Sequence, residues 1–201
     1  MGKQTLISGV IGYFLLLSTP AWSAWWVGAD SQVQFVSIKQ NNIGEISRFD
    51  TITGSVTDEG HVDIRVALDS VETRVDIRNE RMKTLLFEVG AYPEASITGQ
   101  LDTPTLAMVA AGRAGSVSLL LNIDLHGASV QKQAAVLVTP TDDGVTVTTL
   151  EPILLTAAEF GLEAGVAALQ NIAGLSAISR VIPVTINLHL LGERNESILD
   201  S

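Results

Sequence analysis

Three histidines are the residues of this chain with the most versatile chemistry, because imidazole binds metals and exchanges protons near neutral pH. His61, His126 and His189 each occupy a polar position in a segment where apolar and polar residues alternate. If the apolar positions face a core, the histidines point outward from three different strands. A three-histidine zinc site needs its ligands to converge on one point. We therefore expect scattered surface histidines and no metal site.

Other catalytic signatures are missing from the sequence. There is no cysteine, which excludes thiol nucleophiles, thiolate zinc sites and iron–sulfur clusters. Glycine-rich phosphate loops, G-x-S-x-G and H-E-x-x-H do not occur. The carboxylates include no pair in the apolar setting that suits acid–base chemistry. We expect no catalytic residue, and an enzyme that acts on an amphiphilic small molecule is the weaker alternative.

One charged segment, 72–83, could bind a ligand without catalysing a reaction. Its side chains Arg74, Arg78, Arg81 and Lys83 could hold an anionic headgroup, although a solvated helix face is the simpler interpretation. The chain as a whole has a formal net charge of −10 and no run of basic residues. A nucleic-acid partner is excluded on that ground, because phosphates require a basic face.

The N-terminus has the layout of a secretory signal peptide. An apolar run at 6–17 follows a single lysine, and Pro20 precedes small residues near Ser23. Cleavage after Ser23 removes 1–23 and leaves one domain at 24–201. A retained anchor is the alternative, but the run is shorter than the roughly 20 apolar residues that span a bilayer. We expect export to the periplasm and no stable membrane insertion after cleavage.

Alternation with a period of two dominates the rest of the chain. Eight segments carry it, at 31–39, 45–56, 61–69, 95–102, 117–126, 129–139, 144–155 and 181–191. Most of the breaks between them contain Gly, Asn or Asp, which favour tight hairpin turns. The pattern predicts a mainly β protein, an eight-stranded antiparallel up-and-down barrel of lipocalin-like form with one or two short helices.

The apolar face of such a barrel can point inward or outward. Membrane barrels carry aromatic girdles, yet only 5% of these residues are aromatic, so we expect a soluble barrel with an apolar lumen. A barrel of eight strands is either filled by its own side chains or holds one small ligand. The predicted lumen residues are Val33, Phe35, Ile64, Val66, Leu119, Leu121, Ile123, Val136, Val184, Ile186 and Leu188.

A long polar connection, 68–97, interrupts the strands. Connections longer than about 12–15 residues are usually functional or disordered. Asn79 is predicted to cap a helix here, with apolar residues on one face at helical spacing. We expect this segment to act as a lid that closes one mouth of the barrel through Met82, Leu85, Leu86 and Phe87. A second helix is predicted after a capping box at 156–159.

Several short motifs occur in a characteristic order. They are D-S-V-x-T at 69–73, L-L-F-E-V-x-x-Y-P-E-A at 85–95, L-H-G at 125–127 and E-F-G-L at 159–162. In this order and spacing the chain resembles the YceI-like family of bacterial periplasmic proteins, over essentially the whole mature sequence. The resemblance implies a lipocalin-like barrel that binds a polyisoprenoid chain in its lumen. It also implies a role in carrying or storing isoprenoid quinones or related lipids.

These observations lead to one hypothesis of function. The protein is expected to be a periplasmic binding or carrier protein that sequesters a polyisoprenoid or similar long-chain lipid. Its partner would be that hydrophobic lipid, and no cofactor is expected beyond a bound isoprenoid lipid or quinone. The alternative is a ligand-free structural or interaction barrel, and the sequence leaves a homodimer open.

Overall fold

The computed structural model describes residues 25–192, so the predicted signal peptide lies outside the described residues. The strands are β1 (Trp25–Val27), β2 (Gln32–Lys39), β3 (Ile43–Phe49), β4 (Ile52–Val56), β5 (His61–Ala67), β6 (Val71–Glu72), β7 (Glu94–Gln100), β8 (Gly115–Leu125), β9 (Ala128–Pro140), β10 (Gly144–Thr149), β11 (Ile153–Thr156) and β12 (Val181–Gly192). The helices are η1 (Leu68–Ser70), α1 (Asp76–Arg81), η2 (Met82–Leu86), α2 (Thr103–Ala110), η3 (Ala158–Phe160) and α3 (Glu163–Ile172).

All twelve strands belong to one antiparallel sheet that closes on itself. Four pairs, β1 with β2, β3 with β4, β5 with β6 and β10 with β11, are successive halves of bent strands. For example, β1 and β2 both pair with β12, and so do β10 and β11. The result is a closed eight-stranded up-and-down barrel, which confirms the predicted fold class. Closure leaves the central strands without unpaired edges.

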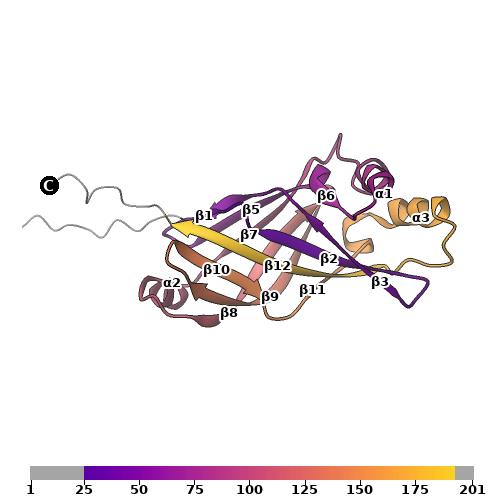
Figure 1. The fold of residues 1–201 in the computed structure, drawn as a ribbon. Coiled ribbons are helices and arrows are strands. Elements are labelled where there is room, and N and C mark those ends of the chain that lie inside the picture. The colour runs from indigo at the N-terminus through magenta and orange to yellow at the C-terminus, as the bar shows by residue number, and fades with distance from the viewer. Residues whose placement is uncertain (1–24, 193–201) are drawn as a thin grey trace, which may run out of the picture.

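Helices cover both ends of the barrel (Figure 1). α1 and α3 lie together over one end, where η2 continues α1 as a single π-helical turn, and α2 lies at the opposite end. No helix between residues 25 and 192 is long and apolar enough to cross a membrane. The barrel interior is therefore enclosed by strands around its sides and by helical segments at its two ends.

α2 is a third helix that the sequence patterns did not predict. Asp102 is its N-cap, and the Asp102 carboxylate accepts a hydrogen bond from the amide of Thr105 at 2.9 Å. Pro104 lies in the first turn, where it costs no hydrogen bond. The sequence Asp-Thr-Pro at 102–104 is typical of a helix start. It follows the predicted strand 95–102 without a break, and Asp102 was taken as the last residue of that strand.

The predicted capping box at 156–159 is confirmed. The amide of Thr156 donates to Glu159 Oε2 at 2.8 Å, and the amide of Glu159 donates to Thr156 Oγ1 at 3.3 Å. Lys132 on β9 adds an ion pair to Glu159 Oε1 at 2.5 Å. The box spans the start of the short helix η3, and α3 begins four residues further on without a side-chain cap. Its position fixes the chain between β11 and α3.

Replacing Glu159 by glutamine is expected to lower the free energy of unfolding by about 1 kcal/mol at pH 7, because a charged cap and ion pair are lost. The hydrogen bond from Lys132 lowers the pKa of Glu159 below its usual 4.5. Its stabilising effect is therefore present at neutral pH and is lost as the pH falls through the lowered folded-state pKa. Urea unfolding of both proteins across this pH range should show the difference in their free energies of unfolding disappear in acid. A difference that persists at low pH contradicts a stabilising role for the ionised Glu159 carboxylate.

Candidate ligand-binding site

The barrel encloses a main chamber of about 380 Å³ at the end covered by α1, η2 and α3. This volume lies within the range of about 300–1,000 Å³ that is usual for small-molecule sites. Its walls are mostly aliphatic and aromatic side chains from β2, β3, β12 and the covering helices. The uncharged polar groups in the walls are hydroxyls, those of Ser37, Ser47, Thr73, Thr156 and Ser179.

Aromatic rings form part of these walls. Four phenylalanines, Phe35, Phe49, Phe87 and Phe160, line the main chamber. The centroid of the Phe49 ring lies 5.5 Å from that of Phe35 and 5.7 Å from that of Phe87, in tilted arrangements. Three of these rings therefore form one continuous aromatic wall where strands β2 and β3 meet the lid.

A second, smaller chamber of about 90 Å³ lies toward the other end of the barrel, beneath α2. Ile97, Ile153 and Ile186 line both chambers, so these three side chains form the constriction between them. Leu106 and Val109 of α2 close the small chamber at its far side. The lumen is thus hollow at both levels, unlike a barrel that is filled by its own side chains.

All eleven predicted lumen residues line one of the two chambers. Val33, Phe35, Val66, Ile123, Val184 and Ile186 line the main chamber. Ile64, Leu119, Leu121, Val136, Ile186 and Leu188 line the small one. Their shared orientation follows from the alternation of side chains along each strand. Whether they contact a ligand stays a prediction.

Sequence reasoning missed some wall residues. Phe49 and Ser47 on β3, and Ala95 on β7, line the main chamber as well. Each lies in the inward phase of a segment predicted as a strand, so the alternation rule, applied to every strand, would have found them. Phe160 was not recoverable in this way, because it lies on η3, outside any strand.

Three of the four predicted lid residues, Met82, Leu86 and Phe87, line the main chamber, but Leu85 does not. The reason is the π-helical turn η2, in which the amide of Phe87 donates to the carbonyl oxygen of Met82 at 2.9 Å. A hydrogen bond that spans five residues widens the turn, so positions 82, 86 and 87 share a face. The prediction assumed the α-helical period of 3.6, which places 82, 85 and 86 together.

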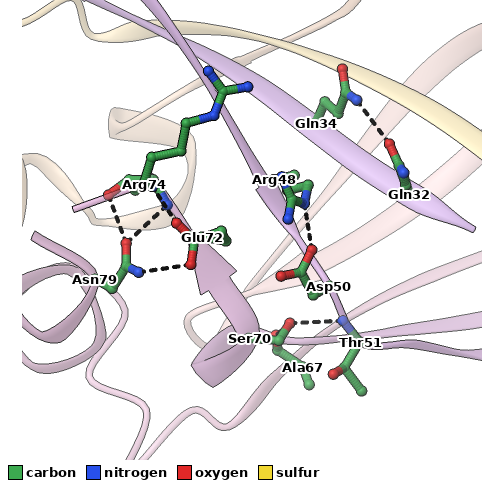
Figure 2. Close-up of polar contacts among 11 residues, drawn as sticks. Gln32, Gln34, Arg48, Asp50, Thr51, Ala67, Ser70, Glu72, Arg74 and Asn79 are labelled. Carbon is green, nitrogen blue, oxygen red and sulfur yellow. Dashed lines mark hydrogen bonds and ion pairs between the residues drawn. The ribbon is translucent and has the colours of Figure 1, made fainter. Parts of the chain in front are cut away.

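The prediction that Asn79 caps the lid helix is wrong. The N-cap of α1 is Val75, and Asn79 is buried inside the helix. The Asn79 side-chain oxygen accepts hydrogen bonds from the amide and hydroxyl of Thr73 at 2.9 and 2.6 Å. Its amide nitrogen donates to Glu72 at 3.2 Å (Figure 2). Asn79 thus ties α1 to the end of β6, and the lid is anchored to the barrel wall.

α3 packs directly on the lid. Gly165 lies where α3 crosses η2, and a Cβ atom at this position would be 2.5 Å from the carbonyl oxygen of Leu85. Val166 and Leu169 of the same helix line the main chamber. The glycine, which weakens helix formation in isolation, is therefore required for close approach of the two backbones.

The basic residues of segment 72–83 divide into two groups. Arg78 and Arg81 line the main chamber, and Lys39 of β2 joins them there. Arg74 and Lys83 do not line it; Lys83 pairs with Glu80 at 3.0 Å, and the Arg74 guanidinium extends away from the Glu72–Asn79 contacts in Figure 2. Only part of the charged segment therefore faces the chamber.

The three histidines lie apart from one another. His61 is exposed, the His126 ring lies 4.3 Å from the Tyr92 ring centroid, and His189 Nε2 is 3.2 Å from Asp143 Oδ1. None of them lines the main chamber or the small one. Within residues 25–192, no three side chains of the metal-binding types gather into a cluster.

Comparison with known proteins adds independent information. The family model described as "YceI-like domain" matches residues 27–190. A polyisoprenoid-binding domain from Saccharophagus degradans, described as implicated in plant cell wall breakdown, is 32% identical, with a TM-score of 0.79; the alignment covers 84% of this chain and 98% of that one. No curated protein sequence matches significantly.

More distant structures share the fold. BcnA from Burkholderia cenocepacia is 18% identical with a TM-score of 0.59, over 81% of this chain and 98% of that one. The YCEI protein from Campylobacter jejuni is 13% identical with a TM-score of 0.50, over 74% of this chain and 84% of that one. At these identities the likeness concerns the barrel architecture alone.

Proposed function

The chain belongs to the YceI-like family, and from this premise we propose that it is a binding protein for a long-chain lipid of the polyisoprenoid type. The observation that carries the proposal is the hollow lumen, a main chamber of about 380 Å³ with apolar walls. The relative from Saccharophagus degradans is described as a polyisoprenoid-binding domain, which supports the same class of ligand here.

The energetics of such binding are favourable without any polar contact. Transfer of hydrocarbon from water yields about 0.8 kcal/mol per methylene, so ten buried carbons contribute roughly 8 kcal/mol before ordering costs. Selectivity would arise from the length and shape of the lumen. The isoleucine constriction at 97, 153 and 186 restricts how far a tail enters the small chamber.

We assign a carrier or storage role rather than catalysis. The chamber walls consist of aliphatic, aromatic and hydroxyl groups together with the cationic side chains of Lys39, Arg78 and Arg81. A long prenyl or acyl tail needs only such a surface, whereas acid–base chemistry needs a titratable pair beside the substrate. The signal-peptide pattern of residues 1–23 supports export, and we propose the periplasm as the site of action.

Mass spectrometry of an organic extract from the purified protein tests this function. The full chain is expressed in a Gram-negative host and recovered from the periplasmic fraction. We expect a prenyl or other long-chain lipid at close to one molecule per protein, absent from an unrelated exported protein purified alongside. A protein that is empty as isolated, and that also fails to bind added prenyl lipid after delipidation, would overturn the proposal.

A further inference from the structure

The charged side chains that line the main chamber are all cationic, namely Lys39, Arg78 and Arg81. The chain as a whole has 22 acidic and 12 basic residues, so this set does not reflect its composition. The acidic neighbours on α1, Asp76 and Glu80, do not line the chamber. The charged part of the chamber wall, called the rim below, is therefore entirely positive and consists of Lys39, Arg78 and Arg81.

The rim lies where the chamber reaches the surface. Val75 and Ile77 at the start of α1 line the chamber and are nevertheless 40% and 59% exposed. Lys39 stands at the end of β2, where it forms a β-bridge with Ile178 of the loop between α3 and β12. Arg78 and Arg81 lie on α1, and Lys39 meets Arg78 through Glu45, so the three cations lie together beside this exposed part of the chamber wall.

One carboxylate partly balances these charges. Glu45 Oε2 lies 2.5 Å from Lys39 Nζ and also accepts from Arg78. The hydrogen bond from Lys39 lowers the pKa of Glu45, so this carboxylate is ionised at neutral pH. Arg81 forms no ion pair with any residue between 25 and 192, and Arg78 Nε is buried without a hydrogen-bond partner. One carboxylate therefore serves two of the three cations, and Arg81 is left without an ion pair among the described residues.

Such unused donors favour a particular class of ligand. Hydrogen bonds between guanidinium groups and oxyanions are roughly twice as strong as neutral ones, and their geometry is often bidentate. We propose that the rim binds the anionic headgroup, a carboxylate or a phosphate, of an amphiphile whose apolar tail fills the main chamber. This inference rests on the proposed function and narrows it, since it favours anionic lipids over neutral quinones and alcohols.

The alternative is that these cations are purely structural. Lys39 and Arg78 could serve only to join β2, β3 and α1 through Glu45, and the Arg78 contact with the carbonyl oxygen of Thr73 at 3.3 Å fits that role. Arg81 discriminates between the two interpretations, because it lines the chamber but takes no part in this ion-pair network.

Matched ligands with one tail test the proposal. The delipidated full chain is titrated with farnesyl phosphate, farnesoic acid and farnesol at low salt, and separately with inorganic phosphate. We expect at least one of the two anionic ligands to bind about tenfold or more tightly than farnesol, with a gap that narrows as salt is added. Inorganic phosphate alone should not bind at the same concentrations. Binding of free phosphate without the tail would overturn the assignment to a lipid headgroup.

Variants then locate the effect. Arg81→Gln should weaken binding of the anionic ligand about tenfold more than it weakens binding of farnesol. Lys83→Gln removes the same charge two residues away, outside the chamber, and should keep the preference. Equal affinity of the unmodified protein for all three ligands, or equal effects of the two variants, overturns the proposal and leaves lipid binding intact. Failure of all three ligands to bind would count against the proposed function itself.

Discussion

Replacing Val184 by tryptophan is expected to reduce lipid loading strongly while leaving the folded protein at least as stable. Val184 lies on β12, pairs with Phe35 of β2 and Ile153 of β11, and faces the main chamber. An indole at this position would extend into empty volume rather than into packed side chains. If it displaces about four methylenes of a tail, the loss is roughly 3 kcal/mol, or about 100-fold in affinity.

The thermal stability of Val184→Trp shows whether a loss of lipid comes from a blocked chamber or from a misfolded protein. Enlarging a side chain in a filled core costs about 1–3 kcal/mol, but here the added ring occupies the cavity. The thermal midpoint of the delipidated variant should therefore equal or exceed that of the unmodified protein.

Thr185→Trp provides the matched control. This neighbour on β12 is exposed, so the same ring points away from the barrel. Lipid content is measured by mass spectrometry of extracts from all three proteins. Normal loading of Val184→Trp would show that the ligand does not occupy the main chamber.

Replacing Gly165 by valine is expected to loosen the lid and speed ligand release about tenfold. The new Cβ would lie 2.5 Å from the carbonyl oxygen of Leu85 and 2.8 Å from Leu86 Cα. Both are backbone atoms, which cannot rotate aside, so α3 and η2 must separate. Met82, Leu86 and Phe87 line the chamber from η2 and its C-cap, and they would move with it. We also expect a loss of about 1–3 kcal/mol in the free energy of unfolding.

Ala164→Val is the control for this variant. Residue 164 is exposed on the same helix, so the control introduces the same side chain at the neighbouring position without touching the lid. The measured quantity is the rate at which a fluorescent lipid leaves the protein for excess acceptor vesicles. Equal rates in the two variants would show that contact between α3 and the lid does not limit release.

The strands were predictable because burial in a barrel imposes a period of two. At β12, Ile186, Leu188 and Leu190 are buried and Thr185 and Asn187 are exposed, as the alternation requires. Which side chains of a helix face the chamber was harder to predict. All four residues Met82, Leu85, Leu86 and Phe87 were predicted to face inward, but in the π-helical turn Leu85 does not line the chamber. The apolar spacing of 82–87 is compatible with either helical period, so the sequence pattern did not distinguish them.

By itself the sequence determined which segments are strands, which side chains share a face and how neighbouring strands connect, because these follow from local periodicity and turn chemistry. Tertiary structure alone decided that the lumen is hollow, since a cavity is the volume that remains after all side chains are placed. It also decided that Lys39 of β2 meets Arg78 and Arg81 of α1 at one rim. Lys39 is far from the two arginines in the chain, and only packing of the lid against the barrel brings its charge to theirs.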